Sequence, residues 1–207
     1  MKVINGNFAY KGIATLQHED AGIVFKKLFE AINPSQILEI GTAYGGLSLL
    51  LRDILNEIGL YDTEIKTYDV DRPPNTFQTG MDYAAKNNLK IDFRLKNIFD
   101  GLESYLVEVD ETTNYIQQTG RTIVLCDGGK KIDEVRILSK LLKPNDIIMA
   151  HDYARNEEIF ENVFKDKIWN WLAIQDSDVQ EIINENNLQP YMKEEFEKVV
   201  WWCVIKI

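Results

Sequence analysis

The sequence predicts an α/β fold with a doubly wound, mostly parallel sheet. Short apolar runs of strand length alternate along the chain with stretches whose apolar residues recur at helical spacing. Four of these runs end in polar or glycine residues: Glu39 with Gly41, Asp69, Asp127, and His151 with Asp152. Parallel strands present their carboxyl ends at one edge of the sheet, so we expect these residues to meet where such folds bind ligands.

Length and composition favour one soluble domain. The 207 residues are divided into an N-terminal flanking segment and helix, 1–33, and a core, 34–207. The formal charge of −10 argues against a nucleic-acid-binding surface. Cys126 and Cys203 lie in apolar runs and are expected to be reduced core residues. No apolar run approaches the roughly 18 residues of a membrane span, and no signal pattern opens the chain, so we expect a cytoplasmic protein without membrane partners.

The most informative stretch is a strand, a glycine turn and a helix. Residues 36–40 form an apolar run that contains Glu39, and Gly41, Gly45 and Gly46 follow in a turn that a ligand can approach closely. Leucine and isoleucine then recur at helical spacing as far as Gly59, a plausible helix end. A unit of this kind opens cofactor-binding α/β domains.

The glycine spacing excludes two familiar ligands. The order is Glu-x-Gly-x-x-x-Gly-Gly, which matches neither the dinucleotide pattern G-x-G-x-x-G nor the phosphate loop with its lysine. The carboxylate of Glu39 would also repel a phosphate group. A nicotinamide oxidoreductase is therefore disfavoured.

The remaining elements follow in order. Apolar periodicity predicts a helix over 17–32 before the first strand and helices over 79–88, 101–118, 132–142, 159–164 and 178–187, the last capped by Asp178. Further strands are predicted over 64–70, 91–95, 121–126, 147–150 and 199–205. Asp69 ends the second strand and is preferred over Asp71 as the carboxylate that binds ribose hydroxyls.

Two carboxylates and an imidazole at neighbouring strand ends predict a metal site. Asp127, His151 and Asp152 offer oxygen ligands that suit Mg²⁺, and the imidazole nitrogen shifts the preference toward Mn²⁺, Fe²⁺ or Zn²⁺. The histidine is alternatively a base or a hydrogen-bond donor.

These motifs carry a family resemblance. The glycine pattern resembles the first motif of class I S-adenosylmethionine (SAM)-dependent methyltransferases. Asp127-x-x-Lys130 followed by His151-Asp152 resembles the metal-dependent catechol-type O-methyltransferases, and more closely the cephalosporin hydroxylase/rhamnosyl O-methyltransferase group. The resemblance covers roughly residues 38–153. The chain departs from the pattern at His151, where those families have Asp or Glu, which puts the metal in doubt.

The resemblance implies a Rossmann-like, seven-stranded sheet with a C-terminal antiparallel hairpin whose first arm is 194–199. It also implies SAM-dependent, metal-assisted methyl transfer to a hydroxyl of a small molecule, with Mg²⁺ or Mn²⁺ held by Asp127, His151 and Asp152. Lys130 or His151 would remove the proton. The implied cofactor contacts are Glu39, Gly41, Thr42, Tyr44, Gly45, Gly46, Ser48, Asp69, Asn97, Ile98 and Asp127.

Two alternative functions stay open. The first is a metal-independent methyltransferase acting on oxygen or nitrogen, and the second is a non-catalytic SAM-binding protein of the same fold. The oligomeric state is also open, because Trp201 and Trp202 on the last strand suit either a core or the interface of a homo-oligomer.

Overall fold

The molecule is built on a seven-stranded sheet with the strand order β5-β4-β3-β6-β7-β9-β8. The structure, a computed structural model, describes residues 8–70, 76–99 and 107–207. The strands of the sheet are β3 (Gln36–Ile40), β4 (Glu64–Asp69), β5 (Asp92–Leu95), β6 (Thr122–Cys126), β7 (Ile147–His151), β8 (Leu188–Pro190) and β9 (Trp201–Lys206). The first five are parallel, and β9 pairs antiparallel with both β7 and β8. The predicted mostly parallel sheet and C-terminal hairpin are confirmed.

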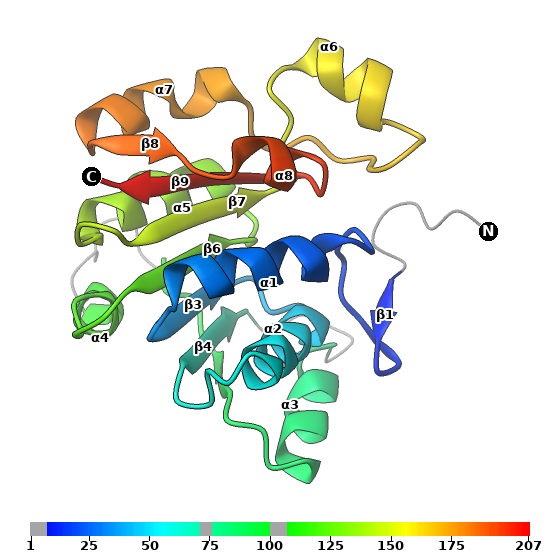
Figure 1. The fold of residues 1–207 in the computed structure, drawn as a ribbon, viewed down its shortest axis with the longest axis vertical. Coiled ribbons are helices and arrows are strands. Elements are labelled where there is room, and N and C mark those ends of the chain that lie inside the picture. Colours follow the sequence, from blue (N-terminus) through cyan, green and yellow to red (C-terminus); the bar gives the residue numbers. More distant parts are fainter. Residues whose placement is uncertain (1–7, 71–75, 100–106) are drawn as a thin grey trace.

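Helices cover both faces of this sheet (Figure 1). They are α1 (Ala21–Ile32), α2 (Gly46–Glu57), α3 (Thr76–Lys86), α4 (Val107–Ile116), α5 (Lys131–Leu138), α6 (Glu157–Ile159), α7 (Asp176–Glu185) and α8 (Lys193–Glu197). A 3₁₀ turn η1 (Ser139–Leu141) continues α5, and a π-helix η2 (Phe160–Phe164) continues α6. A short hairpin of β1 (Ala9–Tyr10) and β2 (Ile13–Ala14) precedes α1. None of the helices in the described ranges is both long and apolar enough to cross a membrane.

The core consists of two apolar layers, one on each face of the sheet. Helices α1, α2 and α8 pack against one set of strand side chains, such as Ile37 and Ile123. Helices α4, α5 and α7 pack against the alternate set, such as Leu38 and Val124. Successive strand residues point to opposite faces, so the continuous apolar runs supply both layers. Cys126 and Cys203 are buried and free, as predicted.

One predicted element needs correction. Residues 194–199 are not the first arm of the hairpin, because 193–197 form helix α8 and Leu188–Pro190 is the arm that pairs with β9. One apolar side chain explains the difference: Phe196 is fully buried and its ring lies 5.5 Å from that of Phe25 on α1. A helix presents this residue to the core and leaves Glu194 and Glu195 exposed.

Several element boundaries also differ from the predicted ones. The helix predicted from residue 17 begins at Ala21, and the one predicted from Asp178 begins at Asp176. Gln175 is the N-cap of α7. The backbone N–H of Gln175 donates a hydrogen bond to the Asp178 carboxylate at 2.8 Å, within a capping box. The first part of the helix predicted over 101–118, and Asp71, fall outside the described residues.

The turn after β3 depends on Gly41. Its φ is +96°, and a Cβ there would lie 2.2 Å from the carbonyl oxygen of Asp127. Gly59, the end of the α2 segment, has a φ of +84° with nothing within 4 Å of its Cβ position. The two glycines share a left-handed backbone, but only Gly41 has a crowded environment.

This contrast yields a stability prediction. We expect Gly41→Ala to lower the free energy of unfolding by about 3 kcal/mol, since it adds overpacking to left-handed strain. Gly59→Ala, the matched control, is expected to lose only about 1 kcal/mol from strain. Urea unfolding of both variants measures the difference, and equal losses would show that the contact with Asp127 does not constrain the turn.

Candidate active site at the carboxyl edge of the sheet

The carboxyl ends of the parallel strands border a cavity of about 310 Å³. Its lining comes from the turns after β3, β4, β6 and β7, from the segment before α1, and from two tryptophans that follow η2. The lining residues are Thr15, Leu16, Gly41, Thr42, Ala43, Leu47, Asp69, Asp127, Gly128, Gly129, Lys131, His151, Asp152, Trp169 and Trp171. The volume falls in the range of small-molecule pockets, and the position is the one predicted from the strand ends.

A smaller cavity of about 60 Å³ adjoins it on the β5 side. The two cavities share Gly41, Asp69 and two glycines of the turn after β6. Asn97 and Ile98, which were predicted as cofactor contacts, line the smaller cavity. The predicted site residues that line a cavity are therefore divided between two adjoining cavities at the same edge of the sheet.

Asp69 braces the glycine turn. Its Oδ2 accepts the backbone N–H of Ala43 at 2.5 Å, and its Oδ1 accepts that of Val70 at 2.7 Å. The neighbouring hydroxyls of Thr42 and Thr67 lie 2.5 Å apart. Ala43 itself has a φ of +48°, a conformation that costs free energy in a non-glycine residue and is common at binding sites. These hydrogen bonds fix the backbone of the turn where it borders both cavities.

Five of the predicted cofactor contacts do not line either cavity. Glu39 and Ser48 are fully buried below the turn, where the Ser48 hydroxyl donates a hydrogen bond to the Glu39 carboxylate. Gly45 and Gly46 instead allow close packing, because Cβ atoms there would meet α3 and the β2 strand. Tyr44 is exposed and lies outside the lining.

Burial changes the acidity of Glu39. Removal from solvent raises the pKa of its carboxyl from 4.5 to about 7. One oxygen, Oε1, is buried and has no hydrogen-bond partner among the described residues. Glu39 thus lies below the turn and lines neither cavity.

The predicted triad of Asp127, His151 and Asp152 is brought together. Nδ1 of His151 lies 3.2 Å from Asp127 Oδ1 and 3.3 Å from Asp152 Oδ1. Ligand atoms of the three residues all lie within 4.8 Å of one another. Asp152 adopts a φ of +60°, which turns its carboxylate toward the cluster.

A lysine completes this cluster, but it is not the predicted one. Nζ of Lys131 lies 2.8 Å from Asp152 Oδ2 and 3.4 Å from Asp127 Oδ1, and donates to the Gly128 carbonyl at 3.0 Å. Lys130 is exposed, and its backbone N–H binds Glu134 at 3.1 Å. The resemblance pointed to Lys130, whereas the first turn of α5 directs the next side chain into the cavity.

Charge and burial oppose each other at this cluster. Burial alone would lower the pKa of the Lys131 ammonium, but the carboxylates of Asp127 and Asp152 raise it above its ordinary value. Burial would likewise raise the pKa of Asp152, and His151 and Lys131 outweigh that effect and hold it below its usual value. Lys131 therefore stays an ammonium and Asp152 a carboxylate near neutral pH.

Other partners fix the cluster from outside the predicted set. The amide of Gln17 donates to Asp127 Oδ2 at 2.9 Å and accepts from the Trp201 indole at 2.7 Å. The Trp169 indole donates to Asp152 Oδ1 at 2.6 Å. The imidazole of His151 lies against both indoles, with ring centroids 4.9 Å from Trp169 and 4.7 Å from Trp201.

Sequence reasoning missed four of these residues, for reasons that differ. Gln17 falls in the predicted helix over 17–32, and Trp169 belongs to none of the motifs. Periodicity does not show which of the adjacent Lys130 and Lys131 faces the cavity. Glu134 is buried, accepts the backbone N–H groups of Gly128 and Lys130, and has its pKa raised by burial to about 7; an acidic residue in a helical segment carries no such signal.

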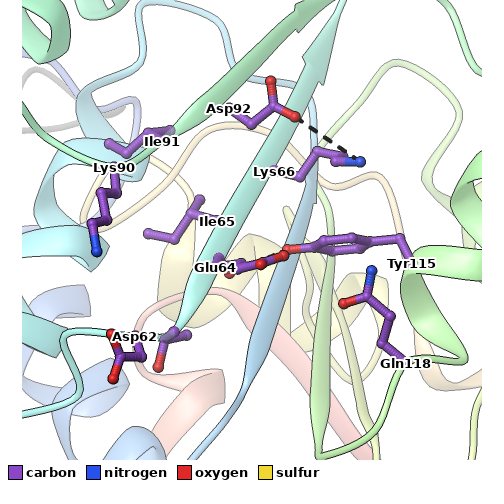
Figure 2. Close-up of a pocket in the computed structure, with 10 residues that line it drawn as sticks. Asp62, Glu64, Ile65, Lys66, Lys90, Ile91, Asp92, Tyr115 and Gln118 are labelled. Carbon is purple, nitrogen blue, oxygen red and sulfur yellow. Dashed lines mark hydrogen bonds and ion pairs between the residues drawn. The ribbon is translucent and has the colours of Figure 1, made fainter.

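A larger cavity lies at the opposite end of β4 (Figure 2). It has a volume of about 680 Å³ and is lined by the starts of β4 and β5 and the end of the α4 segment. Figure 2 shows Lys66 directed toward Asp92, with an ion-pair distance of 4.0 Å. Lys66 also pairs with Glu111 at 3.0 Å. This cavity is remote from the carboxyl ends of the strands, and its Lys66 is already paired with Asp92 and Glu111, so it is not the candidate active site.

Solved structures share this fold. No family model matches the sequence, and no curated protein matches it. CmcI in its apo form superposes with a TM-score of 0.64 at 12% identity, covering 98% of this chain and 77% of CmcI. CmcI with Mg and SAM gives 0.61 at 13% identity over the same shares. A putative caffeoyl-CoA O-methyltransferase from Staphylococcus aureus gives 0.55 at 15% identity, covering 90% of this chain and 82% of that one. The chain therefore has the Rossmann-like fold of these structures.

The buried Glu39 generates a pH prediction. Its pKa rises on folding, so its contribution to stability is fully present below pH 4.5 and is lost as the pH rises to about 7. We expect the stability of the wild type relative to Glu39→Gln to fall by about 3 kcal/mol across that window and then stay constant. Denaturant unfolding of both proteins at several pH values measures this. Taking the difference cancels other titrating groups, Glu134 included, and a flat difference would contradict the burial of an ionisable carboxyl at this position.

Proposed function

We propose that this chain is a SAM-dependent methyltransferase that transfers a methyl group to a hydroxyl of a small molecule. One observation carries the proposal: the cavity at the strand ends is lined both by a glycine turn that lacks the phosphate-binding patterns and by a cluster of acid–base groups. The fold supports it, because solved structures of this fold include CmcI with SAM and a Podospora anserina methyltransferase, PaMTH1, with S-adenosylhomocysteine.

The lining suits a cationic cofactor. Asp69, Asp127 and Asp152 contribute carboxylates to the cavity of about 310 Å³, and Lys131 pairs with the last two of them. SAM supplies, when bound, an electrophilic methyl group on a positively charged sulfur, and it carries no phosphate. Asp69 lines both cavities at the end of β4, where a carboxylate accepts hydrogen bonds from ribose hydroxyls. Asn97 and Ile98 lie beside it at the place proposed for the adenine ring.

The acid–base cluster suits removal of a proton from the acceptor hydroxyl. Two carboxylates face Nδ1 of His151, so its proton is assigned to that nitrogen and the lone pair to Nε2. Nε2 is buried without a partner among the described residues. A carboxylate that fixes the imidazole tautomer in this way makes the other nitrogen a general base. We assign this role to His151, while Lys131, an ammonium, donates to Asp127 and Asp152.

The first test of this proposal is SAM binding. We expect micromolar binding by calorimetry, with Asp69→Asn weakening it by about tenfold because a charged hydrogen-bond acceptor is lost. Asp62→Asn is the matched control, since Asp62 is exposed and lines only the opposite cavity. Absence of SAM binding to the wild type would refute the proposed function.

The second test is turnover. We expect release of S-adenosylhomocysteine when the protein is given SAM and a panel of hydroxylated small molecules, with His151→Asn about 100-fold slower. Lys130→Met is expected to stay within about twofold of the wild type, as an exposed side chain should. SAM binding without product on any acceptor would favour a non-catalytic SAM-binding protein. Loss of activity in Lys130→Met would instead support the role that the family resemblance gives to that lysine.

A further inference from the structure

The position between the two carboxylates of the cluster is already filled by a cation of the chain itself. We propose that the ammonium of Lys131 and a divalent metal ion compete for this one position, and that Lys131 excludes the metal. The fold resemblance favours a metal here, and the ligand atoms of Asp127, His151 and Asp152 lie close enough to hold one. The surroundings of those atoms argue otherwise.

The ammonium has a complete set of acceptors. An ammonium carries three N–H donors, and three oxygens surround Nζ of Lys131: Asp152 Oδ2 at 2.8 Å, the Gly128 carbonyl at 3.0 Å and Asp127 Oδ1 at 3.4 Å. Its side chain is only 10% exposed. A metal bound by both carboxylates would lie within a few ångströms of this ammonium, where two cations repel strongly in a poorly solvated site.

The carboxylates have no oxygen left without a donor. Gln17 binds Asp127 Oδ2, and Trp169 binds Asp152 Oδ1. Lys131 and His151 face Asp127 Oδ1, while Lys131 also binds Asp152 Oδ2. A metal would have to replace several of these contacts at once.

The imidazole is also poorly arranged to bind a metal. If Nδ1 of His151 ligated an ion, the ring proton would move to Nε2, and metal-bound histidines usually donate that proton to a carboxylate, carbonyl or water. Nε2 has no partner in the described part of the chain, and the ring is held between Trp169 and Trp201. The three residues therefore do not fit a divalent ion while Lys131 is present.

The consequence for catalysis rests on the proposed function. Methyl transfer here would proceed with a fixed ammonium where related folds use a divalent ion, and chelators would leave the rate unchanged. Lys131 would be a positioning residue, since it acts by bridging Asp127 and Asp152 and orienting them.

The decisive experiment measures Mn²⁺ binding by electron paramagnetic resonance, without SAM or acceptor. We expect Lys131→Met to bind Mn²⁺ at least about tenfold more tightly than the wild type, because it leaves two close carboxylates uncompensated. Lys130→Met removes the same charge from the neighbouring, exposed position and should bind Mn²⁺ as the wild type does. Adding Asp127→Asn to Lys131→Met should abolish the gain. Equal affinities of the wild type and Lys131→Met, at any level, would overturn the proposal.

A measurement on the unmodified chain covers the case in which Lys131→Met does not fold. We expect amine acetylation, followed by mass spectrometry, to modify Lys131 at least about tenfold more slowly than Lys130, since it is buried and paired. Added Mn²⁺ should leave that rate unchanged. A rise in Lys131 acetylation with Mn²⁺ would show that the metal displaces the ammonium. Because neither assay uses SAM, failure here is distinguishable from failure of the proposed function.

Discussion

The close contact between the turns after β3 and β6 determines how the candidate site is assembled. The backbone N–H of Asp127 donates to the Ile40 carbonyl at 2.8 Å, and Gly41 leaves no space for a side chain against the carbonyl of Asp127. The two turns therefore meet backbone to backbone. This brings the glycine turn and the acid–base cluster to adjacent walls of one cavity, which neither strand could form alone.

Charge balance is the second organising feature. The chain carries a formal charge of −10, and the cavity collects three carboxylates in a partly buried place. Such a group of carboxylates is stable only with compensating donors. The protein supplies them from four directions: the first turn of α5, the end of β7, the segment before α1 and the loop after η2. The proposed exclusion of a metal ion rests on this balance, because the ammonium of Lys131 already lies between Asp127 and Asp152.

The indole and imidazole rings give this polar cluster a rigid frame. Trp169 and Trp201 contact the imidazole of His151, and each also uses its N–H in the cluster or in the Gln17 bridge to it. Large aromatic side chains that hydrogen-bond at one end combine apolar packing with polar orientation. Trp201 therefore links the acid–base groups to the core layer of α1 and α2, and Trp169 links them to a smaller cluster with Phe160 and Phe164.

The sequence by itself determined the fold class, the parallel strands and the identity of the acidic residues at their carboxyl ends, because apolar periodicity and glycine positions are local properties of a chain. Asp69, Asp127, His151 and Asp152 were placed at the correct edge for that reason. Only the tertiary structure decided that Glu39 lies below the turn and that Lys131 faces the carboxylates. It also brought Gln17 to Asp127, 110 residues away in the chain. Those outcomes depend on side-chain direction and on contacts between distant segments, which no periodicity within one element records.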